Sequence, residues 1–137
     1  MRTLVWLADG TWEACVDAAR GQEGEITLLY VVDNDTMAAL SGSAGLLGRN
    51  SPTQAGDVLA EAGEAVLTAA ERRLGRECGR AMRWGRPERE VVAACADVDV
   101  LVVARDGDRL VVGPRSLGHA TRFVVDHAPC SVLLVWP

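Results

Sequence analysis

Apolar residues along this chain follow two alternating patterns, short continuous runs and longer stripes with helical spacing. Continuous runs are typical of parallel strands that are covered on both faces. Five segments have the pattern of strands, the third of them shorter and more polar: residues 3–8, 25–32, 80–84, 98–104 and 130–136. Between them, apolar residues recur every three or four positions, which predicts helices near residues 12–19, 51–77, 87–95 and 117–128.

The alternation of strand and helix patterns predicts one α/β domain over residues 1–137. Parallel strands need crossover connections, and a helix usually supplies them. Because such crossovers are right-handed, the expected fold is a Rossmann-like, three-layer, doubly wound sheet of five parallel strands with helices on both faces.

Residues 33–50 depart from the alternation because they are rich in Gly, Ser and Ala and show weak periodicity. We expect a long loop there, beside the predicted site, since loops of this length in a compact domain are usually functional. Two predicted helices have capping signals at their starts. Thr11 precedes the first, and residues 51–54 (Ser-Pro-Thr-Gln) resemble a capping box with proline at the first helical position.

The composition narrows the classes of function. The net charge is −5 and all 14 basic residues are arginine, a usage that points to a bacterial genome of high GC content. A negative chain is a poor general partner for nucleic acid or an anionic membrane. The absence of lysine excludes mechanisms that need a lysine side chain. No apolar run approaches the ~18 residues of a membrane span, and no cleavage signal follows Met1, so we expect a cytoplasmic protein.

The cysteines and histidines offer little for a metal site. Cys15, Cys78, Cys95 and Cys130 include no C-x-x-C pair, and the chain has only 2 histidines. A cytoplasmic chain of this size seldom relies on disulfides. We therefore expect no metal and four reduced cysteines that serve as small core residues.

In an open parallel sheet, ligands bind beyond the carboxyl ends of the strands, where the winding reverses. In this chain those ends lead into residues 9–11, residues 31–33, Gly85 and residues 105–118. The last of these segments runs into a predicted helix N-terminus, whose free N–H groups and dipole favour an anion such as phosphate.

Several short motifs in these segments resemble those of the universal stress protein family, in the same order and over nearly the whole chain. They are Asp-Gly-Thr at residues 9–11, Tyr-Val-Val-Asp at 30–33, Gly-Arg-Pro at 85–87 with Glu-Val-Val at 90–92, and His-Ala-Pro-Cys-Ser-Val at 127–132. The resemblance implies a role in stress response or signalling, exerted by binding an unknown protein partner and not by catalysis.

Some members of this family bind ATP through the motif G-x2-G-x9-G-[S/T] after the fourth strand, and others lack it. With the last glycine placed at Gly118, the earlier glycines fall on Arg105 and Asp108, and the hydroxyl falls on His119. Glycine lets the backbone approach phosphates closely, whereas Asp108 brings a negative charge to them. We therefore expect no resident cofactor and only weak binding of ATP.

The resemblance also implies which residues a degenerate nucleotide site would contain. They are Asp9, Val31, Arg105, Asp108, Gly118 and His119. Asp9 would lie near the nucleotide and its metal, although it could instead only turn the chain into the first helix. The Val31 backbone would meet the adenine ring.

The loop before Gly118 allows two readings. Arg105, Arg109 and Arg115 could bind phosphate together, or they could form a solvated, ion-paired loop with Asp106 and Asp108. Under the first reading the arginines compensate for the lost glycines, and the protein is a nucleotide-binding regulatory module.

A weak nucleotide hydrolase is a further alternative. The chain contains no G-x-S-x-G elbow and no Walker motif, and neither histidine has a nucleophile at motif spacing. We therefore expect no catalytic residues.

By the family resemblance, the last strand lies at an edge of the sheet. This segment carries no charge and has no proline before Pro137, so it is suited to pair with a second copy of itself. We expect a homodimer whose interface contains Ser131, Val132, Leu133, Leu134, Val135 and Trp136.

Overall fold

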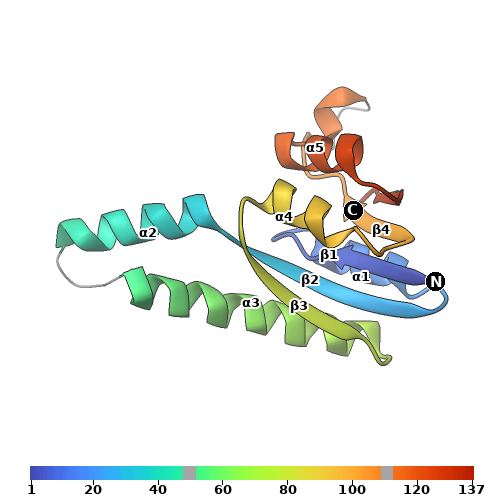
Figure 1. Cartoon of the computed structure of the whole chain (residues 1–137), viewed down its shortest axis with the longest axis horizontal. Helices are drawn as coiled ribbons and strands as arrows, with labels where there is room; N and C mark the ends of the chain where they lie inside the picture. The colour runs from blue at the N-terminus through green and yellow to red at the C-terminus, as the bar shows by residue number, and fades with distance from the viewer. Residues whose placement is uncertain (48–51, 109–112) are drawn as a thin grey trace.

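A computed structural model describes residues 1–47, 52–108 and 113–137 of the chain. Its strands form one parallel sheet in the order β3-β2-β1-β4-β5 (Figure 1). The strands are β1 (Arg2–Trp6), β2 (Glu25–Asp33), β3 (Gly79–Gly85), β4 (Val100–Ala104) and β5 (Ser131–Val135). The helices are α1 (Trp12–Ala19), α2 (Asn34–Leu47), α3 (Pro52–Leu74), α4 (Pro87–Ala94) and α5 (His119–His127), with a short 3-10 turn at Pro114–Ser116.

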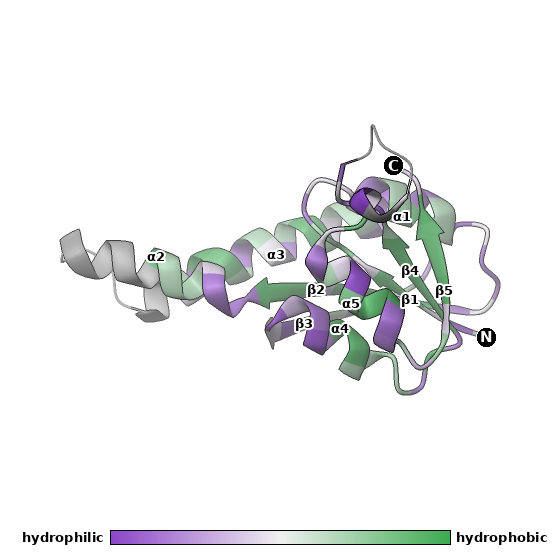
Figure 2. Cartoon of the chain, turned by 90° about the horizontal axis from the view of Figure 1, so that it is seen from above, coloured by the Kyte–Doolittle hydropathy of each residue, from purple (hydrophilic) through white to green (hydrophobic). Residues whose placement is uncertain are grey.

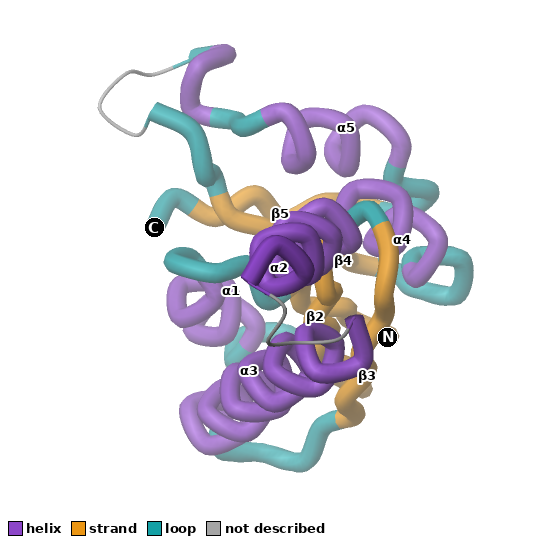
Figure 3. Tube along the Cα trace, turned by 90° about the vertical axis from the view of Figure 1, so that its left-hand side faces the viewer, coloured by secondary structure: helices purple, strands orange, loops and turns teal. Residues whose placement is uncertain are grey.

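This strand order confirms the predicted doubly wound sheet. The chain adds β2 and β3 on one side of β1 and then crosses back to add β4 and β5 on the other side. Right-handed crossovers place α1 and α3 on one face and α4 and α5 on the other. Figure 3 shows the resulting three layers end-on, with the strands between the two pairs of helices.

Each face of the sheet has its own buried core. Successive residues of β1 point to opposite faces, so Val5 joins the core under α1 and α3 while Leu4 joins the core under α4 and α5. In β4, Val102 and Val103 divide in the same way, and neither is accessible to solvent. The central strands are apolar on both faces, which is why their sequences show no alternation of apolar and polar residues.

Residues 34–47 form helix α2, so the loop predicted there is wrong. The Asp33 carboxylate accepts a hydrogen bond of 2.8 Å from the Asp35 N–H at the point where the helix begins. Alanine and leucine in the segment favour a helix. The periodicity is weak because most of α2 extends beyond the end of the sheet, where it runs alongside α3 (Figure 1). Residues 48–50 of the predicted loop lie outside the described residues.

Two helix termini differ in detail from their predictions. Thr11 stands at the start of α1, but its hydroxyl makes no capping bond; its backbone N–H donates to the Ala8 carbonyl at 3.3 Å. Helix α3 ends at Leu74, earlier than predicted, because Gly75 turns the chain with a φ of +70°. Ser51 of the predicted capping box lies outside the described residues.

Helix α3 packs closely on the sheet at Gly63. A Cβ added at this residue would lie 2.7 Å from both Cδ1 of Tyr30 and Cε of Met82. Gly56, earlier in the same helix, has more room. A Cβ there would meet nothing nearer than 3.9 Å, at Met37 and Trp84.

We therefore expect Gly63→Ala and Gly56→Ala to shift stability in opposite directions. Gly63→Ala should lower the free energy of unfolding by about 1–3 kcal/mol, because the Tyr30 and Met82 side chains must move to admit the methyl group. Gly56→Ala should raise it by up to about 1 kcal/mol, because alanine loses less backbone entropy in a helix. Urea unfolding of the two variants measures both effects, and a stable Gly63→Ala protein would contradict the close packing.

Candidate functional site

A cavity of about 200 Å³ opens at the carboxyl ends of β1 and β2. Its lining includes Asp9 and Val31, two of the residues predicted for the site. Thr36 of α2, Leu59 of α3 and Pro87 at the start of α4 complete part of the wall. The structure thus brings together the predicted residues that follow or end the first two strands.

Tyr30 is a member of this cavity that the sequence analysis missed. Its hydroxyl donates a long hydrogen bond of 3.4 Å to the Asp9 carboxylate. Burial raises the pKa of Tyr30, and the negative charge of Asp9 raises it further, so the hydroxyl stays protonated as a donor at neutral pH. Tyr30 belongs to the Tyr-Val-Val-Asp motif of residues 30–33, but a tyrosine within an apolar strand has the pattern of a core residue, and only its neighbour Val31 was assigned to the site.

The other four predicted residues, Arg105, Asp108, Gly118 and His119, do not line this cavity. Arg105 follows β4, where its guanidinium donates to the Ser116 hydroxyl and lies 5.1 Å from the centroid of the Trp136 ring. Its backbone N–H also donates to the Val135 carbonyl at 2.9 Å. Arg105 therefore holds the loop against the end of β5. Arg109 lies outside the described residues.

The loop after β4 pairs with itself through its backbone. The Gly107 N–H donates to the Ser116 carbonyl at 3.0 Å, and the Asp108 N–H donates to the Arg115 carbonyl at 2.6 Å. A Cβ at Gly107 would lie 2.2 Å from the Arg115 carbonyl oxygen, so only glycine permits this approach. These two N–H groups are consequently engaged within the loop.

The N-terminus of α5 is capped by a carboxylate of the protein itself. One oxygen of Asp106 accepts a 2.8 Å hydrogen bond from the Gly118 N–H, and the other accepts a 2.8 Å bond from the Thr121 hydroxyl. Thr121 is buried, so Asp106 satisfies a hydroxyl that would otherwise lack a partner. His119, the first residue of α5, is exposed. Asp106 thus places its negative charge where the helix N-terminus favours an anion.

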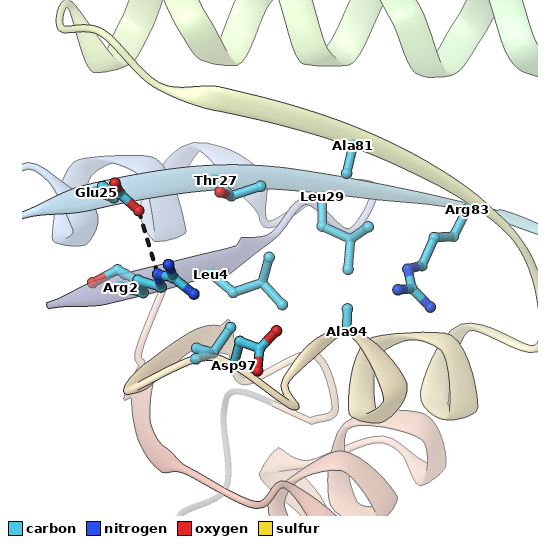
Figure 4. Close-up of a pocket in the computed structure, with 11 residues that line it drawn as sticks. Arg2, Leu4, Glu25, Thr27, Leu29, Ala81, Arg83, Ala94 and Asp97 are labelled. Atoms are coloured by element: carbon cyan, nitrogen blue, oxygen red, sulfur yellow. Dashed lines mark ion pairs between the residues drawn. The ribbon is translucent and has the colours of Figure 1, made fainter.

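A larger cavity, of about 310 Å³, lies near the amino ends of β1 and β2, beside the end of α4 (Figure 4). Leu4, Leu29 and Ala81 form an apolar floor across three strands, and the Arg2–Glu25 ion pair of 3.4 Å lies at one end. None of the predicted site residues lines it. Because ligands of open parallel sheets bind at the carboxyl ends of the strands, we take the cavity at Asp9 and Val31 as the candidate site.

The helices of the described residues do not include one that is both long and apolar enough to cross a lipid bilayer.

Comparison with known proteins identifies the class of this fold. A model of the universal stress protein family matches residues 8–135. A universal stress protein of Methanothermobacter thermautotrophicus is 29% identical over 123 residues, which cover 90% of this chain and 84% of that protein. The chain therefore belongs to the universal stress protein family, as its motifs predict.

Solved structures share the fold at lower identity. The hypothetical protein MJ0577 superposes with a TM-score of 0.72 and 19% identity, over 99% of this chain and 96% of that one. A universal stress protein in complex with cAMP superposes with a TM-score of 0.63 and 18% identity, over 99% of this chain and 96% of that one. These likenesses confirm the Rossmann-like α/β architecture.

The cap on α5 can be tested by comparing two aspartates at opposite ends of that helix. Asp106→Ala should lower the free energy of unfolding by about 1–3 kcal/mol, because it removes the cap and strands the buried Thr121 hydroxyl. Asp126→Ala, near the helix C-terminus, should change it by less than about 0.5 kcal/mol. Equal effects of the two substitutions in chemical denaturation would show that Asp106 is not a structural cap.

Proposed function

We propose that this universal stress protein acts by binding a protein partner in a stress response or signalling process, without catalysis and without tight binding of ATP. The observation that supports this proposal most directly is the Asp106 carboxylate on the N-terminus of α5. A phosphate group placed at that helix terminus would have to displace it.

Coulomb's law gives the size of the repulsion between the Asp106 carboxylate and a phosphate group. Two like charges 4 Å apart repel by about 1 kcal/mol in water and by about 4 kcal/mol near a protein surface. An incoming phosphate would meet this repulsion from Asp106. It would also lack a hydrogen bond from the Gly118 N–H, which already donates to Asp106. Either penalty alone weakens binding by roughly fivefold or more.

The rest of the loop supports the same conclusion. The N–H groups of Gly107 and Asp108 donate to carbonyls on the other side of the loop. The Arg105 guanidinium is engaged by Ser116 and the Trp136 ring. A nucleotide would have to break these contacts before the loop could hold its phosphates.

A nucleotide-binding regulatory module is the second candidate. It is favoured by the cavity that unites Asp9 and Val31, and by the structural similarity to a universal stress protein that was solved with cAMP. The cavity of about 200 Å³ is smaller than the roughly 300–1,000 Å³ of most ligand pockets. A ligand with one phosphate makes fewer demands on the loop after β4 than ATP does.

We also propose that the protein is a homodimer paired through β5. This strand lies at an edge of the sheet, where only β4 pairs with it. In contrast to β1 and β4, none of its residues is fully buried, although four of the five are apolar. Leu133 is 36% exposed and Trp136, just beyond the strand, is 48% exposed. Figure 2 shows the hydrophobic colour over most of β5, and a second copy would cover this apolar edge.

We predict that ATP binds no more tightly than about millimolar, which corresponds to about −4 kcal/mol. Titration calorimetry with ATP, with and without Mg²⁺, measures the affinity directly. A thermal-shift series with ATP, AMP and cAMP separates the second candidate, because a nucleotide-binding module should be stabilised by at least one of them. Micromolar binding of ATP would overturn the proposal.

Two multiple variants distinguish Asp106 from the altered glycine motif. Arg105→Gly, Asp108→Gly and His119→Ser together restore the motif, and a second variant adds Asp106→Ala to these three changes. If the Asp106 carboxylate blocks the anion position, only the second variant should gain affinity for ATP, by tenfold or more. A gain already present in the first variant would assign the block to the motif residues, and circular dichroism checks that both proteins fold.

The dimer can be tested at Leu133 without disturbing the protomer's core. Val132 and Leu134 pack against the core under α4 and α5, whereas Leu133 is the most exposed leucine of the strand. Leu133→Lys should therefore give a folded monomer, because it places a charge in the interface. Val58→Lys on α3, at a side chain that is 58% exposed, is the matched control and should leave the dimer intact. Light scattering at a protein concentration of tens of micromolar measures the mass of each variant in solution. If the unmodified protein is monomeric under these conditions, the proposal is contradicted.

A further inference from the structure

We propose that Cys95 and Cys130 form a redox site, in which hydrogen peroxide converts their two thiols reversibly into a disulfide. Both residues belong to the core under α4 and α5. The Cys130 sulfur is also among the groups that raise the pKa of the Cys95 thiol, which makes the two sulfur atoms neighbours within this core. They lie 35 positions apart in the sequence, so the fold alone brings the two sulfur atoms together.

The backbone holds both cysteines at neighbouring strand entrances. Cys95 ends α4, and its carbonyl accepts a 3.1 Å hydrogen bond from the Val98 N–H in the turn toward β4. Cys130 immediately precedes β5, whose first residue, Ser131, donates to the Asp99 carbonyl at 3.2 Å. Because β4 and β5 are adjacent and in register, the turns before them lie side by side.

The two thiols differ in their access to solvent. Cys95 is fully buried, and burial followed by the neighbouring Cys130 sulfur raises the pKa of its thiol to about 12. Cys95 is therefore protonated at neutral pH and closed to bulk oxidants. Cys130 is partly exposed, so a small oxidant can reach its sulfur first.

The disulfide between Cys95 and Cys130 would form in two steps. In the first step, the Cys130 sulfur attacks one oxygen of hydrogen peroxide, so that an S–O bond forms and the O–O bond breaks. The hydroxide that leaves takes up the Cys130 proton and becomes water. In the second step, the Cys95 sulfur attacks the Cys130 sulfur, so that an S–S bond forms and the S–O bond breaks. The leaving hydroxyl group combines with the Cys95 proton to give a second water molecule. Two electrons pass from the thiols to the peroxide, and a dithiol reductant reverses the change.

The other two cysteines provide an internal contrast. Cys15 and Cys78 belong to the opposite face of the sheet. Burial alone raises the pKa of Cys15 to about 12. The pKa of Cys78 is raised by burial and by Glu71, so neither thiol has another sulfur among the groups that shift its pKa. We therefore expect the disulfide to join one pair only.

The test is a peptide map of the intact protein after treatment with hydrogen peroxide. Remaining thiols are alkylated in denaturant, and trypsin, which cleaves here only after arginine, releases Cys95 in residues 90–105 and Cys130 in residues 123–137. We expect these two peptides to be linked, with two thiols lost per chain and full recovery after dithiothreitol. Four alkylated cysteines, or a cross-link between two chains, would overturn the proposal.

Variants identify the order of the steps. Cys78→Ser is the matched control and should form the same linkage as the unmodified protein. Cys130→Ser should leave Cys95 available to alkylation in denaturant, because the buried thiol does not meet the oxidant. Cys95→Ser should leave a sulfenic acid on Cys130 that dimedone traps. If Cys95→Ser does not fold, the peptide map of the unmodified protein still decides the question.

The anion position and the β5 edge play no part in this chemistry, so these results are independent of the proposed function.

Discussion

The pairing of β1 in the centre of a parallel sheet is the interaction on which the rest of this structure depends. Val5 of β1 lies opposite Leu28 of β2 on one side and Val102 of β4 on the other. Parallel pairing on both sides requires helical crossovers, and their single handedness puts two helices on each face. The carboxyl ends of β1, β2 and β4 consequently meet at one edge, where the winding reverses and the candidate site lies.

At that edge a carboxylate of the protein itself, that of Asp106, occupies the position where the start of α5 would otherwise favour an external anion. A parallel sheet directs the loop after β4 into the start of a helix, whose N–H groups need acceptors. Asp106 accepts from the Gly118 N–H and from the Thr121 hydroxyl, and carbonyl groups of the loop accept from the N–H groups of Gly107 and Asp108. The helix start and the loop before it, which can bind phosphate in Rossmann-like proteins, are engaged by internal hydrogen bonds in this chain.

The β5 edge of the sheet differs from the edge that holds the candidate site. Strand β5 has a neighbour on one side only, and its apolar side chains are incompletely covered by α1 and α5. At its entrance the Cys95 and Cys130 thiols meet beneath α4 and α5. The protein therefore combines an internally capped helix start with a partly exposed apolar strand, and places a pair of thiols next to that strand.

Elements with a local signal in the sequence could be predicted from it. Apolar runs and helical stripes predicted every strand and four of the five longer helices, because a strand buried on both faces is continuously apolar and a helix buried on one face repeats apolar residues every three or four positions. Family motifs then indicated Asp9, Val31 and the altered glycine positions. Helix α2 escaped prediction because it lies largely off the sheet and has no apolar stripe to record. Three further relations required the folded chain: the hydrogen bonds of Asp106 with Gly118 and Thr121, the stacking of Arg105 on Trp136, and the proximity of Cys95 to Cys130. Those partners are separated by 12 to 35 positions, beyond any capping or helical spacing, and they meet only because adjacent parallel strands bring their connecting turns together.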